Sequence, residues 1–160
     1  MEKEISNTAI QIITYLPKYQ IGITKMLAEI ALEFEESIFS NSPNRGPILP
    51  NPYWLALQKK EVVGTVGLLP ISNHKAILKS MMVKKSFRGK ALGLSNLLLQ
   101  TAIHWCQTNA INQVYLGTMT QFKAAQSFYQ KNGFQQISKD KLPGDFINNP
   151  LDSIYFYRGL

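Results

Sequence analysis

Hydrophobic positions along the chain follow two different spacings, and their order predicts a mixed α/β (α+β) fold. Extended patterns predict strands over residues 8–16, 53–58, 62–69, 76–83, 113–118, 134–138 and 153–158. Helical spacing predicts a helix from about residue 23 and further helices over 93–108 and 122–132. Strands 53–58 and 62–69 should form an antiparallel hairpin. Strands 76–83 and 113–118 are joined by a helical crossover, so we expect them to be parallel.

The most informative stretch is a strand, a basic loop and a helix that follow one another directly. The apolar strand ends at Val83, the loop contains Arg88, Gly89 and Gly93, and the apolar face of a helix begins at Leu94. The first amides of a helix have no carbonyl partner, and the helix dipole adds positive charge there. Glycines let main-chain N–H groups approach a ligand closely. This order therefore favours an anion site, with phosphate as the natural guest.

Composition limits the class of protein. The 160 residues are 45% hydrophobic, which suits a single domain over 1–160. No apolar run approaches the ~20 residues of a membrane span, and the N-terminus lacks the apolar core of a signal peptide, so we expect a cytoplasmic protein without membrane contact. The one cysteine, Cys106, agrees with a reducing compartment. Its place beside Trp105 in the helical pattern favours packing over a role as nucleophile.

The net charge of +7 is concentrated around the loop. Between residues 59 and 90 there are eight basic residues and one acidic residue, Glu61, so the rest of the chain is nearly neutral. This charge suits a ligand with several phosphates. A nucleic-acid-associated protein is an alternative, but no nucleic-acid motif and no aromatic–basic interleaving accompany the charge.

Two nucleotide motifs do not fit the loop. A P-loop requires Gly-x-x-x-x-Gly-Lys-[Ser/Thr], whereas here Gly89 and Gly93 are four residues apart and Leu94-Ser95 follows. The Gly-x-Gly-x-x-Gly fingerprint of dinucleotide sites is also absent.

The loop instead resembles the acetyl-CoA motif of the GNAT superfamily of N-acetyltransferases, [Gln/Arg]-x-x-Gly-x-[Gly/Ala]. In this chain the motif runs Arg88-Gly89-Lys90-Ala91-Leu92-Gly93, with Ala91 where the family has its first glycine. A second stretch, Ala125 to Phe134, resembles the family pattern Ala-x-x-x-Tyr-x-x-x-Gly-Phe. The resemblance implies a GNAT fold, a mostly antiparallel mixed sheet of six or seven strands flanked by about four helices.

The same resemblance implies an activity and a set of site residues. The expected reaction is direct transfer of acetyl from acetyl-CoA to a primary amine of a small molecule or peptide in a ternary complex, with no metal, and homodimers are common in the family. Tyr129 matches the position of the family's acid for the departing thiolate. The residues implied for cofactor binding are Met81, Met82, Val83, Arg88, Gly89, Lys90, Ala91, Leu92, Gly93, Leu94, Ser95 and Ala125.

The sequence identifies neither the acceptor nor the base that accepts its proton. The amine must lose a proton before it attacks, but the strand over 76–83 lacks the glutamate that many relatives place there. The candidate bases are Glu35, Glu36, His74, Asp145, Asp152 or a chain of water molecules. The proline-rich stretch over 37–52 is interpreted as a loop beside the acceptor, with an ordinary surface connection as the alternative. A GNAT-like protein that binds CoA without turnover is a further alternative, motivated by Ala91 and the missing glutamate.

Overall fold

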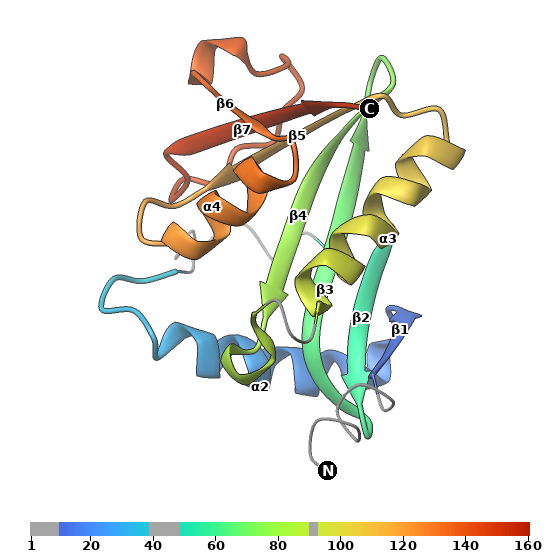
Figure 1. Cartoon of the computed structure of the whole chain (residues 1–160), viewed down its shortest axis with the longest axis vertical. Helices are drawn as coiled ribbons and strands as arrows, with labels where there is room; N and C mark the ends of the chain where they lie inside the picture. Colours follow the sequence, from blue (N-terminus) through green and yellow to red (C-terminus); the bar gives the residue numbers. More distant parts are fainter. Residues whose placement is uncertain (1–9, 39–48, 90–92) are drawn as a thin grey trace.

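The computed structural model describes residues 10–38, 49–89 and 93–160 as one open sheet with helices on both faces (Figure 1). The seven strands lie in the order β1-β2-β3-β4-β5-β7-β6. Their bounds are β1 (Ile10–Thr14), β2 (Tyr53–Gln58), β3 (Glu61–Ile71), β4 (Lys75–Val83), β5 (Gln113–Thr118), β6 (Gln135–Ile137) and β7 (Ile154–Gly159). The α-helices are α2 (Gln20–Ala31), α3 (Leu94–Thr108) and α4 (Lys123–Lys131), and the 3₁₀ turns are η1 (Pro17–Tyr19), η2 (Lys85–Phe87) and η3 (Lys139–Lys141).

The sheet confirms the predicted fold class and its main connections. β2 and β3 pair antiparallel, and β4 and β5 pair parallel across the crossover through α3. Every other neighbouring pair in the described sheet is antiparallel. The expected "about four helices" correspond to the three α-helices of the described residues, with the 3₁₀ turns beside them. β7 lies between β5 and β6 in the sheet. The chain therefore forms the edge strand β6 first, and its last strand, β7, then pairs with both β5 and β6.

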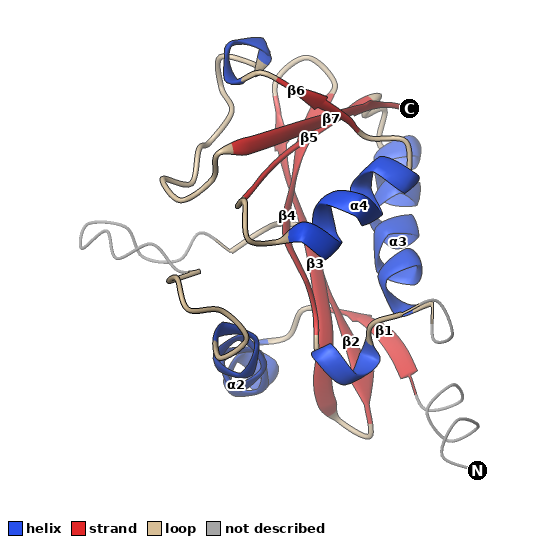
Figure 2. Cartoon of the chain, turned by 60° about the vertical axis from the view of Figure 1, so that its left-hand side comes forward, coloured by secondary structure: helices blue, strands red, loops and turns tan. Residues whose placement is uncertain are grey.

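The helices lie in two layers that cover opposite faces of the sheet. α3 and α4 cover one face and α2 covers the other (Figure 2). Leu98 and Ala102 of α3 are buried in the first core, whereas Ile23 and Met26 of α2 are buried in the second. These residues recur three or four positions apart, which is the spacing that places them on one side of a helix. Within the described residues, no helix combines the length and apolarity needed to cross a bilayer.

Candidate functional site

The centre of the sheet opens between β4 and β5. Their parallel pairing runs from Lys75 and Gln113 to Ile77 and Tyr115 and then stops. β4 continues to Val83 and β5 continues to Thr118, so the two strands separate as they approach α3 and α4. The last half of β4 therefore has no β5 neighbour, and main-chain groups on that side of the strand are left for another partner.

A β-bulge shapes the same half of β4. Gly67 pairs with Lys79 and Thr65 pairs with Met82, so the single residue between Thr65 and Gly67 faces two residues of β4. Ser80, one of these two, has a φ of 54°, and its carbonyl accepts a hydrogen bond of 2.6 Å from the Thr65 hydroxyl. Thr65 is fully buried. This buried hydroxyl holds the bulge and directs the main chain that leads into Met81, Met82 and Val83.

The loop after β4 ends at an open helix N-terminus. Gly89 has a φ of 113° and Gly93, the N-cap of α3, has a φ of 62°. No described atom lies within 4 Å of the position that a Cβ would take at either glycine. Leu97 N–H donates to the Gly93 carbonyl, so the amides of Leu94 and Ser95 precede the helical hydrogen-bond ladder. Predicted cofactor residues Lys90, Ala91 and Leu92 lie outside the described residues.

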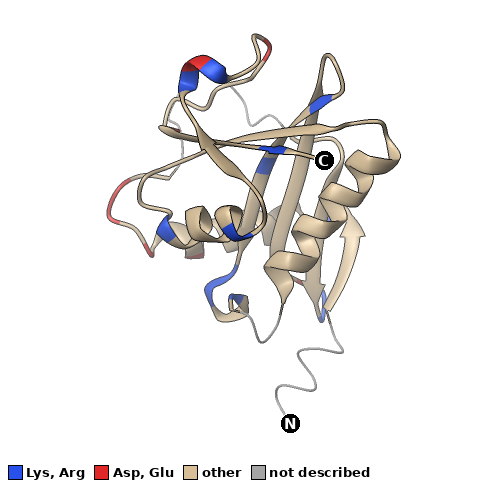
Figure 3. Ribbon diagram, turned by 45° about the horizontal axis from the view of Figure 1, so that its top comes forward, with Lys and Arg blue, Asp and Glu red and all other residues tan. Residues whose placement is uncertain are grey.

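Lys and Arg residues gather between the end of β4 and the start of α3 (Figure 3), and part of their charge is paired with glutamates of the same chain. The Arg88 guanidinium donates to both carboxylate oxygens of Glu33, at 2.6 and 2.8 Å, and its Nε donates to the Val83 carbonyl at 2.8 Å. Lys84 Nζ lies 2.5 Å from Glu61 and 3.4 Å from Glu29. The side chain of Arg88 therefore ties the loop to the residues after α2.

Tyr129 lies on α4 at the edge of the core beneath that helix. Its ring packs against Phe134 and Phe156, with centroid distances of 5.6 and 5.9 Å. The side chain is buried, and its hydroxyl has no hydrogen-bond partner among the described residues. Burial, with a smaller effect of the nearby Asp152 charge, raises the pKa of Tyr129 well above its usual value. The hydroxyl therefore keeps its proton. Ala125, one turn earlier, is partly buried against the same core.

Asp152 lies on the opposite face of the sheet, where β5 separates from β4. Val114 and Leu116 of β5 point into the core under α3 and α4, so Gly117 points to the other face. A Cβ at Gly117 would lie 2.6 Å from Asp152 Oδ2, which means that the carboxylate rests on the bare main chain of β5. Ser153 N–H donates to the Thr118 carbonyl at 3.0 Å and fixes this contact.

Lys79 of β4 is the positively charged residue whose charge acts on the Asp152 carboxylate. Its ammonium donates to the Ile147 carbonyl at 3.3 Å and lies 6.0 Å from the centre of the Phe146 ring. Burial lowers the pKa of Lys79, and the charge of Asp152 partly opposes that shift. Burial raises the pKa of Asp152 to about 6, and the charge of Lys79 partly opposes that shift in turn.

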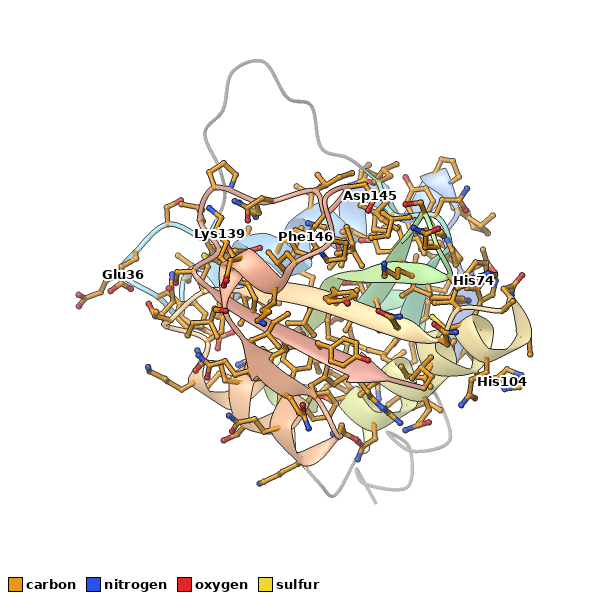
Figure 4. All side chains as sticks on the ribbon, turned by 90° about the horizontal axis from the view of Figure 1, so that it is seen from above. Glu36, His74, His104, Lys139, Asp145 and Phe146 are labelled. Carbon is orange, nitrogen blue, oxygen red and sulfur yellow. The ribbon has the colours of Figure 1, made fainter. Side chains whose placement is uncertain are left out.

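The other candidate bases occupy different surroundings (Figure 4). His74 lies in the turn before β4, at the opposite end of the strand from the loop, and its Nδ1 is 2.9 Å from the Ala110 carbonyl. Asp145 accepts hydrogen bonds from the main-chain N–H and the hydroxyl of Ser72, at 2.8 and 2.7 Å. Glu35 and Glu36 are exposed beyond the end of α2. Of the five candidates, Asp152 alone is half-buried beside the separating strands.

Four residues of this site were missed by the sequence analysis: Glu33, Thr65, Lys79 and Gly117. Thr65 carried a usable signal, because a threonine inside the apolar run of β3 is a polar group that needs a partner. Glu33 and Gly117 carried none, since their partners are distant in sequence. Cys106 is fully buried, and this burial raises its thiol pKa to about 11, which agrees with a packing role. No group of three or more His, Cys, Asp or Glu side chains suited to a metal occurs in the described part of the chain.

Comparison with known proteins finds acetyltransferases. Residues 23–134 match the model of the "Acetyltransferase (GNAT) family". The probable N-acetyltransferase camello of Xenopus tropicalis is 28% identical over 108 residues, which cover 66% of this chain and 48% of that protein. N-acetyltransferase 8B of Rattus norvegicus is 32% identical over 92 residues, covering 54% of this chain and 40% of that protein. The chain thus spans less than half the length of these curated relatives.

Solved structures resemble the whole chain. An acetyltransferase of the GNAT family from Staphylococcus aureus has a TM-score of 0.82 and 30% identity, covering 94% of this chain and 99% of its own. The PaiA N-acetyltransferase of Thermoplasma acidophilum, in complex with coenzyme A, has a TM-score of 0.71 and 18% identity, covering 94% of this chain and 99% of its own. This second likeness shows the fold.

Proposed function

Since the chain belongs to the GNAT family of acetyltransferases, we propose that it transfers the acetyl group of acetyl-CoA to a primary amine of a small molecule or peptide. The transfer is direct, in a complex that holds both substrates. The observation that carries this proposal is the separation of β4 from β5 just where β4 leads into the open N-terminus of α3.

The N-terminus of α3 suits the pyrophosphate of acetyl-CoA. The amides of Leu94 and Ser95 point out of a 15-residue helix, and the left-handed Gly93 before them has no side chain to block an approaching anion. Gly89, Lys90, Ala91 and Leu92 belong to the same proposed set through their place in the motif. Arg88 is engaged by Glu33, so in this proposal it holds the loop in shape.

The free edge of β4 suits the pantetheine arm of the same molecule. Beyond Ile77 this edge has no β5 partner, so main-chain groups near Met81, Met82 and Val83 are available to an extended chain that carries amides. The bulge at Ser80 changes the direction of the strand where the thioester would lie. An arm that enters there passes between β4 and β5, with Ala125 and Tyr129 on the α4 side.

Tyr129 suits the role of acid for the departing thiolate. The hydroxyl of a tyrosine is protonated at neutral pH, and that of Tyr129 has no hydrogen-bond partner among the described residues. A proton placed at the sulfur lowers the barrier to breaking the carbon–sulfur bond.

Calorimetry and a thiol assay test the proposal together. Acetyl-CoA and duplex DNA are titrated separately into the protein, and thiol release from acetyl-CoA is then followed with a panel of amines, amino acids and aminoglycosides. The proposal expects micromolar binding of acetyl-CoA and thiol release that depends on an amine. Binding without release from any amine would support a CoA-binding protein without turnover. Binding of DNA alone would overturn the proposal.

A further inference from the structure

We propose that Asp152 is the base that takes the proton from the acceptor amine, and that the amine enters on the face of the sheet opposite α3 and α4. This inference rests on the proposed function and adds the residue that the sequence could not choose. It also names the acceptor class, an amine that binds as its ammonium ion.

The position of Asp152 fits a base for this reaction. Its carboxylate rests against Gly117, just beyond the last pair of β4 with β5 at Ile77 and Tyr115. Asp152 and Tyr129 lie on opposite faces of the sheet, and the negative charge of Asp152 adds to the effect of burial in raising the pKa of Tyr129. An acetyl group between the two strands would have the base on one side and the proposed acid on the other.

The Asp152 carboxylate has no partner among the described side chains that would compete with a proton or an ammonium ion. No ion pair joins it to another described residue, and no described donor forms a hydrogen bond with it. All fully buried polar side-chain atoms of the described residues have partners, so these oxygens must be reachable from solvent. A half-buried carboxylate without a partner is costly to the fold, and such groups are found at sites of binding and proton transfer.

The surroundings of Asp152 set its charge. Lys79 of β4 is the charged group that acts on Asp152, and Asp152 in turn raises the pKa of Tyr129 of α4 and of Tyr155 of β7. Lys79 favours the ionised carboxylate, while burial opposes it. The ammonium of Lys79 contacts the Ile147 carbonyl and the Phe146 ring, and it acts on Asp152 through its charge without an ion pair between them. Lys79 is therefore a positioning residue that keeps the base ionised near neutral pH.

The protons balance in the proposed step. The acceptor enters as R–NH₃⁺ and gives one proton to Asp152, and the nitrogen lone pair then attacks the acetyl carbonyl carbon. The carbon–sulfur bond breaks and the thiolate takes the phenolic proton of Tyr129, which regains a proton from the nitrogen directly or through water. The third proton stays on the amide. Asp152 releases its proton to solvent, so one proton is released per turnover.

Asp152→Asn tests the base directly because the amide has the shape of the carboxylate but accepts no proton. The wild type should lose kcat/KM as the pH falls through about 6, since Asp152 must be ionised to act. The variant should bind acetyl-CoA as the wild type does, turn over about 10²-fold more slowly near neutral pH, and lose the midpoint near 6 in its pH profile. Its rate should then rise tenfold per pH unit toward the amine pKa of ~10.4, because only amine already neutral in solution can react.

Two further variants separate a role in proton transfer from a role in folding. Asp140→Asn makes the same change at an exposed carboxylate between β6 and β7, and it should leave kcat/KM unchanged. Lys79→Met should raise the midpoint of the acidic limb, and Lys79→Arg should restore it. A shift of this kind would not follow from a purely structural role.

The possible outcomes distinguish this inference from the function on which it rests. Loss of turnover near neutral pH and of the midpoint near 6 in Asp152→Asn, with acetyl-CoA affinity kept, supports the inference. Wild-type turnover with the same acidic limb in Asp152→Asn overturns it and leaves the acetyltransferase function intact. A wild-type protein that neither binds acetyl-CoA nor releases thiol overturns both.

Discussion

Arg88 and Glu33 form a bidentate ion pair that joins the loop before α3 to the residues after α2. The guanidinium donates to both oxygens of the carboxylate, at 2.6 and 2.8 Å. Because its Nε also donates to the Val83 carbonyl, the same side chain fixes the end of β4. The pair therefore connects the proposed cofactor loop with the side of the sheet from which we expect the acceptor to enter.

A double-mutant cycle tests whether this pair acts by holding the loop. Glu33→Gln and Arg88→Gln should each weaken acetyl-CoA binding about threefold to tenfold, and the double variant should lose little more than either one, since both remove the same contact. Arg88→Lys should fail to restore binding because an ammonium lacks the planar fork. Isothermal calorimetry gives the affinities of the wild type and of the four variants. Arg88 would be a direct phosphate ligand if Arg88→Gln weakened binding while Glu33→Gln left it unchanged.

The buried hydroxyl of Thr65 should matter to catalysis through the bulge of β4. Thr65→Val keeps the shape of the side chain but removes the 2.6 Å hydrogen bond to the Ser80 carbonyl. We expect the free energy of unfolding to fall by about 1 to 2 kcal/mol and kcat/KM for acetyl-CoA to fall about tenfold. Urea unfolding and steady-state kinetics measure the two effects. Thr65→Ser, which keeps the hydroxyl, is the matched control, and full activity in Thr65→Val would remove the bulge from the account.

Tyr129→Phe should separate turnover from binding. The ring packing against Phe134 and Phe156 is kept, so the fold and the acetyl-CoA affinity should stay near those of the wild type. The lost phenolic proton should lower kcat about 10²-fold. Steady-state rates beside calorimetric affinities provide the comparison, with Phe128→Leu as a control for packing on the same helix. Equal kcat in Tyr129→Phe and the wild type would take the hydroxyl out of the mechanism.

The local spacing of hydrophobic and turn residues was sufficient to predict most strands of the sheet. β2 and β5 occupy the predicted ranges 53–58 and 113–118 residue for residue, because both are short apolar runs bounded by turn residues. The parallel pairing of β4 with β5 followed from the crossover between them. Strand ends were less well predicted: β3 extends to Ile71 because it pairs with β4 as far as Lys75, a contact that no local pattern reveals.

The site was only partly predictable for a related reason. The phosphate loop is contiguous in sequence, so its glycines and the helix after it could be recognised together. The acceptor side combines Lys79, Gly117 and Asp152, which come from three separate elements and meet only when β4 and β5 diverge. One sequence gives no reason to choose Asp152 over Asp145. The structure distinguishes the two carboxylates. Asp145 accepts two hydrogen bonds from Ser72, whereas the carboxylate of Asp152 has no such partner among the described residues.

The turn between β2 and β3 offers a test of stability alone. Lys59 and Lys60 have φ values of 50° and 70°, a conformation that side chains other than Asn and Gly adopt at a cost. The double change Lys59→Asn, Lys60→Gly should raise the free energy of unfolding by about 1 kcal/mol, as measured in urea. A double change to alanine removes the same charges but keeps the strained backbone, and it should give no such gain. A gain of equal size in the alanine variant would assign the effect to charge.

Calorimetric titration of acetyl-CoA into the wild type and Gly93→Asp tests the central claim most directly. The substitution places a negative charge at the first amides of α3. No described atom lies within 4 Å of the new Cβ, and the left-handed φ of 62° costs about 1 to 2 kcal/mol, a cost that the alanine control shares. Gly93→Ala serves as the uncharged control and should weaken binding less. We predict micromolar binding by the wild type and no detectable heat with Gly93→Asp, and equal affinities in the two proteins would contradict the account.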